Sequence, residues 1–438
     1  MAEKHPADAE IALEVEWPQI VPEGTDRARD ASLGRLSLRF VDQILTSYKS
    51  DKGDVGSHVE IPTYDLAEWI ASNWWPLLFE PPKSDDETTD YVHRHWLGAA
   101  RSGFALPDVT FAPAGDRIEV TAKECYLRFA RLTFLENATG SVSREAFQGA
   151  FSVFVEGVLD RLTKRGVSDT SAHEAWQLVK GTDKDAEDYC RLVGSLGLCP
   201  YDEHPEIDAI LEQVSSALDV SMMVDLCEAS DSQSLRSVAA VAEKLTGALP
   251  RGQIVDFSCL ANIDAPSDHS LAAYRWGLEG TKLVRQYLGI SSRDPAGAGS
   301  FFEKLGFDVN RTESVTDNST DLVRISAAFA RDDDSMKVAL GEPRETQRRF
   351  TAARAAFLGW IEGDKAKRFV TGARTRNQQA SRAFAAELLA PISHIQSRTG
   401  GRTISTYRID EIAEELHVSP AVVRYQAQNN RMHVAENW

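Results

Sequence analysis

Apolar residues recur at three- and four-residue steps in two neighbouring stretches near the C-terminal end of the chain. This spacing places them on one face of a helix, so residues 348–363 and 376–391 are each predicted to form an amphipathic helix. Pro391 is expected to close the second helix because proline has no backbone N–H. The positions that define the two apolar faces are Phe350, Ala353, Phe357, Trp360, Ala380, Ala383, Phe384 and Leu388.

The N-terminal third mixes helical spacing with the alternating apolar positions that are typical of strands. Strands are predicted at residues 36–41, 109–112, 117–122 and 126–135, and helices at residues 64–79 and 143–165. Residues 1–31 are polar and acidic and contain three prolines, so we expect a loose tail there. A mixed α/β domain is therefore predicted over residues 32–165.

The middle of the chain is predicted to be helical. Residues 168–196, 206–218 and 232–249 each show three-four spacing, which indicates a helical connector over residues 166–250. Beyond it, strands are predicted at 253–257, 322–329 and 336–340, and helices at 271–288 and 296–305. The expected fold class is α+β, with a C-terminal domain over residues 251–400 and a final segment over residues 401–438.

The amino-acid composition limits the kinds of partner that this protein could bind. The formal net charge is -18, which argues against a broad electrostatic grip on nucleic acid or on anionic lipid. Five scattered cysteines without a CxxC pair indicate free thiols in a reducing compartment. The N-terminus lacks the apolar stretch of a signal peptide, and no run approaches the ~20 apolar residues of a membrane span. We expect a cytoplasmic protein with no membrane partner.

The two C-terminal helices resemble the zinc-peptidase core of the ImmA/IrrE family. In that family one helix reads RFTxAHExxH and a second supplies a further ligand before a run that reads FAAELLMP. Residues 349–351 of this chain read RFT and residues 384–391 read FAAELLAP. The resemblance covers roughly residues 276–430 and implies a zincin fold in this part of the chain.

The metal ligands of that family are not carried over. In register, the two histidine positions fall on Arg354 and Leu358, the catalytic glutamate on Ala355, and the third ligand on Gln378. Zinc sites are built from histidine, cysteine or carboxylate donors, and arginine stays protonated. We therefore expect a degenerate member with no zinc and no cofactor. Because a buried cation needs a partner, an ion pair between Arg354 and Glu387, with Gln378 beside it, is predicted to fill the site.

Residues 409–429 resemble a helix-turn-helix, with Ser419 and Pro420 starting the second helix. The second helix is predicted to expose side chains that could reach bases or phosphates, and the candidates for DNA contact are Arg424, Gln426, Gln428 and Asn429. Acidic residues on the first helix oppose that role. The alternative is that both helices pack on the peptidase-like core.

Two further groups of residues are candidate sites. Trp69, Trp74 and Trp75 lie within seven residues and either line a pocket or pack in a core. His93 and His95 would share one face of a strand, and they form a conceivable but incomplete metal pair.

Three functions remain open from sequence. The first is a non-catalytic ImmA/IrrE-like bacterial regulator, of stress or mobile-element type, that binds a protein or peptide in the former cleft. The second is an active zinc metallopeptidase with displaced ligands, which would draw on His394 or Glu387. The third is a DNA-binding regulator that acts through residues 409–429.

Overall fold

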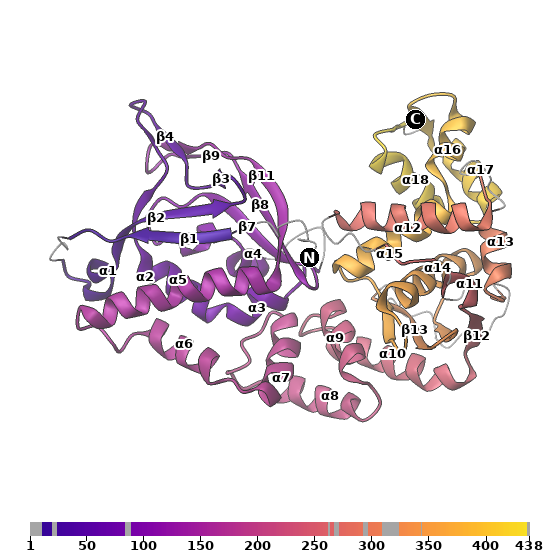
Figure 1. Cartoon of the computed structure of the whole chain (residues 1–438), viewed down its shortest axis with the longest axis horizontal. Coiled ribbons are helices and arrows are strands. Elements are labelled where there is room, and N and C mark those ends of the chain that lie inside the picture. Colours follow the sequence, from indigo (N-terminus) through magenta and orange to yellow (C-terminus); the bar gives the residue numbers. More distant parts are fainter. Residues whose placement is uncertain are drawn as a thin grey trace, which may run out of the picture. The chain divides into compact units, whose positions relative to one another are not determined.

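The computed structural model describes residues 11–19, 24–83, 89–261, 263–266, 271–291, 297–308, 324–342 and 344–435. The chain forms two compact units, Met1–His204 and Pro205–Trp438. Each unit combines helices with small, mainly antiparallel sheets, so the fold class is mixed α+β (Figure 1). In the described part of the chain, no helix has the length and apolar character needed to cross a bilayer.

Three antiparallel sheets form the β part of the first unit. The first contains β1 (Ile11–Glu16), β2 (Leu33–Phe40), β3 (Gln43–Ile44) and β6 (Val59–Pro62). The second contains β4 (Tyr48–Ser50), β5 (Val55–Gly56), β9 (Cys125–Leu127) and β10 (Leu132–Phe134). The third contains β7 (Asp108–Pro113), β8 (Arg117–Lys123) and β11 (Ala138–Ser143).

The expectation of a loose tail over residues 1–31 is wrong for β1, which pairs along its whole length with β2. Ile11 and Leu13 are buried while Glu14 is exposed, which is the period-two pattern of a half-buried strand. The surrounding prolines and acidic residues hid this short alternation. Helix α1 (Arg27–Ala31) also lies within the supposed tail, and the Asp26 carboxylate caps its first turn.

Seven helices and one short 3-10 helix complete the described part of the first unit. Helix α5 follows an N-cap at Ser143, and its Phe147 and Phe151 rings stack on each other and contact Phe111 of β7 edge-on. The elements besides α1 are α2 (Thr63–Ser72), α3 (Trp74–Phe79), α4 (Thr89–His95), the 3-10 helix Leu97–Ala100, α5 (Arg144–Lys164), α6 (Ser171–Gly181) and α7 (Lys184–Ser195).

The tryptophan cluster is part of the core of this unit. Trp69, Trp74 and Trp75 are all buried, and Trp74 meets Trp176 of α6 edge-on at 4.9 Å between ring centroids. The Trp75 indole N–H donates to the Tyr201 hydroxyl at 2.8 Å, so its polar atom is satisfied as well. Core packing therefore accounts for these side chains.

The second unit is built on an antiparallel sheet of order β12-β14-β13-β15. Its strands are β12 (Gln253–Asp256), β13 (Ile325–Asp332), β14 (Ser335–Leu340) and β15 (Lys367–Thr371). Sequence spacing missed β15 and assigned its residues to a basic connector, because its two leading basic residues interrupt the apolar alternation. Around the sheet lie α8 (Pro205–Ser215), α9 (Val220–Ala229), α10 (Leu235–Ala248), the 3-10 helix Leu249–Arg251, α11 (Ser258–Ala261), α12 (Ala273–Leu288) and α13 (Gly297–Lys304).

Helices α14 (Glu345–Glu362) and α15 (Arg376–Leu389) pack on each other, and α12 packs along α15 (Figure 1). The approach of α12 to α15 depends on Gly277, because a Cβ there would lie 2.2 Å from the Ala380 carbonyl oxygen. Phe357 of α14 and Phe384 of α15 meet at 4.9 Å between ring centroids. These contacts bury most of α14, which explains why its apolar face is wider than one stripe.

The C-terminal segment contains α16 (Ile392–Thr399), β16 (Thr403–Ser405), α17 (Thr406–Leu416), α18 (Pro420–Asn429) and β17 (His433–Ala435). The expected helix-turn-helix is formed by α17 and α18. His417, at the usual glycine position of the turn, adopts a left-handed backbone with φ of 51°. Strands β16 and β17 pair in parallel and close the segment.

Candidate functional site

Arg354 occupies the centre of the α14–α15 pair. Its guanidinium is buried, and its Nε donates to the Ser381 hydroxyl at 3.0 Å. Its Nη2 donates to the Thr371 carbonyl oxygen at 2.6 Å and to the Gln378 Oε1 at 2.8 Å. We call Arg354, Gln378, Ser381 and the end of β15 at Thr371 the Arg354 cluster. The arginine links both helices to the strand between them.

Gln378 completes the Arg354 cluster. Its Oε1 also accepts from the Thr371 N–H at 3.0 Å, and its Nε2 donates to the Phe369 carbonyl oxygen at 2.8 Å. The side-chain amide therefore bridges α15 to β15 while it holds Arg354. A buried amide with donors and acceptors satisfied in this way fixes the geometry of its neighbours.

The electrostatics of the cluster are unusual for a buried cation. Burial, with a smaller contribution from Arg382, holds the pKa of Arg354 well below its ordinary value, and Glu342 partly opposes this. Burial and the neighbouring Arg374 lower the pKa of Arg382 to about 10. Burial raises the pKa of Glu342, against the effect of Arg354. Arg354 thus lies close enough to Arg382 to feel its charge, and Glu342 is the carboxylate that offsets part of this effect.

The expected ion pair between Arg354 and Glu387 is wrong. Both residues belong to the described part of the chain, and no ion pair joins them there. Glu387 instead accepts from the Gln426 Nε2 at 2.7 Å and from the Ile392 N–H at 3.3 Å. Hydrogen bonds to a serine, an amide and a carbonyl oxygen replace the charge pair around Arg354, because those groups lie closer than any carboxylate.

In the register of the resemblance, Leu358 takes the position of the second histidine and Ala355 that of the catalytic glutamate, and neither side chain has a donor atom. Ala355 and Leu358 are fully buried in the apolar core of the unit. His394, considered as a displaced ligand, lies on α16 with its Nε2 3.2 Å from Glu415. Across the described ranges, no three or more His, Cys, Asp and Glu side chains form a group that could hold a metal ion. A guanidinium, two apolar side chains and an amide do not fit the zinc that the resemblance implies.

The histidine pair is also corrected. His93 and His95 lie on helix α4 rather than on a strand, so they do not share one face. His95 is fully buried, and its Nε2 lies 3.0 Å from Glu80, whereas His93 is exposed. The shared face depended on residues 93–95 forming a strand, and a pattern of three residues does not distinguish a strand from a helix.

The candidates for DNA contact separate into two groups. Gln426 is buried and donates to Glu387 and, at 3.0 Å, to the Ala390 carbonyl oxygen, so its assignment as an exposed contact is wrong. Gln428 and Asn429 are exposed and Arg424 is half-buried. Gln426 thus joins α18 to the end of α15, which favours the packing role for this face of the helix.

Some residues of the site escaped sequence analysis. Ser381 lies one helical turn beyond Gln378 on α15, so i,i+3 spacing could have grouped the two. Asp225 of α9 gave no signal, although its carboxylate binds the Arg368 guanidinium at 2.7 and 2.8 Å and the Phe369 N–H at 2.8 Å. Such a contact joins residues more than 140 positions apart, which no local pattern reveals.

The comparisons with known proteins give no independent assignment. Searches against models of protein families, curated proteins and solved structures found no match to this chain.

Proposed function

We propose that this chain is a non-catalytic ImmA/IrrE-like protein of bacterial regulatory type, which binds a partner protein or peptide at the position of the former peptidase cleft. The observation that carries the proposal is the Arg354 cluster. In the register that the resemblance implies, an arginine tied to Gln378 and Ser381 takes the position of a zinc ligand. The buried cluster satisfies its own hydrogen bonds and provides no donor set for metal chemistry, which supports a non-catalytic role. The half-buried Arg382 beside it is the side chain that we expect to contact a partner.

The charge of the region indicates the class of partner. Arg382 is half-buried, and its Nη2 donates to the Ala373 carbonyl oxygen at 2.9 Å without a carboxylate partner in the described part of the chain. Arg374 lies near enough to lower its pKa. In a chain with net charge -18, this local excess of positive charge favours a partner that presents an acidic side chain or a terminal carboxylate. Five free cysteines are consistent with the cytoplasmic location that we also propose.

The non-catalytic part of the proposal is tested by metal content. After equilibration with zinc and extensive dialysis, the purified protein is expected to hold far less than one zinc per chain. An arginine, a leucine and a neutral glutamine take the ligand positions, whereas a zinc site needs histidine, cysteine or carboxylate donors. Elemental analysis measures this directly. One tightly held zinc per chain, lost in Glu387→Gln or His394→Ala, would instead establish the metallopeptidase with displaced ligands.

The partner part of the proposal is tested with a fluorescein-labelled hexaglutamate peptide. Binding is expected to weaken about tenfold or more in Arg382→Gln, since a hydrogen bond to a charged group contributes roughly 1.5–3 kcal/mol. Fluorescence anisotropy measures the affinity, which is also expected to fall with added salt. Arg236→Gln serves as the control, because Arg236 is an exposed arginine on α10. Equal affinities for all three proteins would refute the acidic partner.

A further inference from the structure

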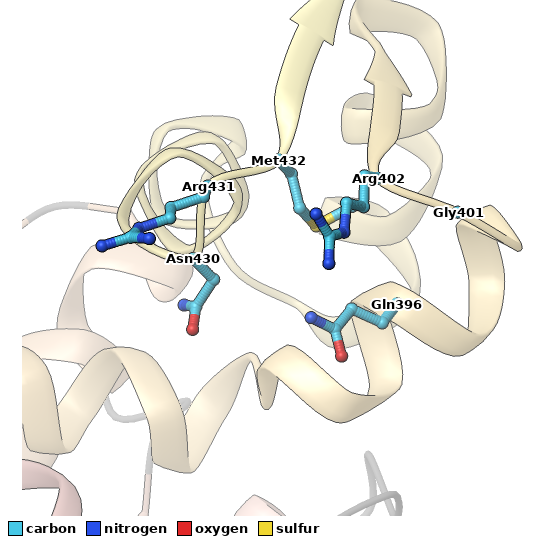
Figure 2. A pocket seen from close by; sticks show the side chains of 6 residues that line it. All are labelled: Gln396, Gly401, Arg402, Asn430, Arg431 and Met432. Carbon is cyan, nitrogen blue, oxygen red and sulfur yellow. The ribbon is translucent and has the colours of Figure 1, made fainter.

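A pocket of about 480 Å³ lies in the C-terminal segment (Figure 2). Three parts of the chain contribute to it: the end of α16, the loop before β16, and the turn after α18. The lining residues are Gln396, Gly401, Arg402, Asn430, Arg431 and Met432. The lining carries two arginines and two amides but no carboxylate, which is unusual in a chain with 66 acidic and 48 basic residues.

The backbone around the pocket is held by hydrogen bonds. The His433 N–H donates to the Arg402 carbonyl oxygen at 2.7 Å, and the Met432 N–H donates to the Ala427 carbonyl oxygen at 2.9 Å. The buried Met432 packs in the core of the second unit. Arg431 adopts a left-handed backbone with φ of 58°, a conformation that is unfavourable for a residue with a Cβ. The walls of the pocket are therefore built by the fold rather than by a free loop.

The charge in the pocket is available to a ligand. In the described part of the chain, the side chains of Arg402 and Arg431 have no hydrogen-bond or ion-pair partner. Two acids of α17 in the same segment pair with other basic side chains, since Glu415 contacts His394 and Arg398, and Glu411 contacts Arg408. Figure 2 shows the Arg402 guanidinium pointing toward Gln396, whereas that of Arg431 points away from the pocket. Arg402 is thus the central cation.

We propose that this pocket binds a phosphate group. A guanidinium presents a planar fork of donors that matches a phosphate in a two-pronged contact, and the amide of Gln396 adds further donors. The Asn430 amide is anchored by its Nδ2, which donates to the Gln426 carbonyl oxygen at 2.9 Å, and its second N–H remains for a ligand. This proposal is independent of the function proposed for the Arg354 cluster.

The phosphate has two possible sources. One is a small phosphorylated molecule, for which a concave pocket of this volume has room. The other is the backbone of a nucleic acid, because the pocket lies where α18 ends, beyond the exposed Gln428 and Asn429. Both sources place the same group against Arg402, and they are separated by the choice of probe.

Calorimetric titration with inorganic phosphate and pyrophosphate, and an electrophoretic mobility assay with duplex DNA, test the site in the full chain. Binding of at least one probe is expected, with a loss of about tenfold or more in Arg402→Gln. The affinity of Arg402→Lys is expected to lie between those of the unaltered protein and Arg402→Gln. Lysine keeps the positive charge but not the planar set of donors of a guanidinium. Arg236→Gln is expected to bind as the unaltered protein does.

A second readout covers the case in which a variant is poorly folded. Phenylglyoxal modifies accessible arginines, and phosphate or DNA is expected to slow the modification of Arg402 but not of Arg236 in the unaltered protein. Protection by phosphate assigns a small ligand, and protection by DNA alone assigns the nucleic acid. Binding of neither probe, or binding that Arg402→Gln leaves unchanged, would overturn the proposal.

Discussion

Replacing Glu80 with glutamine is expected to destabilise the first unit by about 3 kcal/mol. Glu80 is buried, and its two oxygens accept from Arg94 at 2.7 and 2.8 Å, while His95 lies 3.0 Å away. The substitution keeps the shape of the side chain but removes the charge that compensates a largely buried guanidinium. Urea denaturation, with hydrogen exchange to locate the change in the first unit, measures the loss.

The same carboxylate makes the stability of this unit depend on pH. Hydrogen bonds from Arg94 and His95 outweigh the opposing effect of burial and lower the pKa of Glu80 from 4.5 to about 2. A carboxylate with a lowered pKa stabilises the fold above its unfolded pKa, so this contribution is complete above about pH 4.5 and is lost as the pH falls toward 2. The Glu80→Gln variant is expected to lack this part of the acid transition.

A matched control is Glu16→Gln. Glu16 pairs with Arg35 at 3.1 Å, but both side chains are more than half exposed. Exposed pairs contribute about 0–1 kcal/mol, so little change is expected. If the two variants lost the same amount of stability, the buried network around Glu80 would not be an important source of stability.

Replacing Asp225 with alanine is expected to destabilise the second unit by about 3 kcal/mol or more, because breaking a buried ion pair leaves an uncompensated charge. Asp225 is fully buried and binds both the guanidinium of Arg368 and the backbone N–H of Phe369. Glu362 also contacts Arg368, at 2.6 Å, which limits the loss. Hydrogen exchange is expected to increase in β15 and at the adjoining end of α15.

The comparison for this variant is Glu279→Ala. Glu279 pairs with Lys282 on the exposed surface of α12, at 3.3 Å. A change of less than about 1 kcal/mol is expected there. Unaltered exchange in β15 of the Asp225→Ala protein would show that the ion pair does not hold the strand.

Local patterns predicted the elements that bury one continuous face. Helix α5 begins and ends as expected from its Ser143 cap and its apolar spacing, and α14 and α15 lie where the two C-terminal stripes placed them. Strand β15 was missed because its two basic residues interrupt the apolar alternation. It is held instead by tertiary contacts, to β13 on one edge and to Asp225 at Arg368 and at the Phe369 N–H. Intrinsic strand propensity is a weak guide where tertiary contacts determine whether a segment forms a strand.

In the site, too, the sequence predicted some contacts and missed others. Sequence register placed Arg354 beside Gln378, and the structure brings them to 2.8 Å. The sequence did not show that Glu387 accepts a hydrogen bond from α18 instead of pairing with Arg354. The donor that competes for Glu387 is Gln426, nearly 40 positions away. Side-chain geometry in three dimensions decides which of two polar groups contacts a buried charge. Residue type and spacing along one helix do not determine that geometry.

The contacts of Asp225 with Arg368 and Phe369 of β15 bear on how the chain can be divided for expression. A fragment that starts at residue 251 would lack α9, and with it the carboxylate that covers Arg368. It would also lack Asp231, which pairs with Arg324 at 3.1 Å. A recombinant fragment that begins at Pro205 spans the whole second unit and keeps both acids with the strands that they hold.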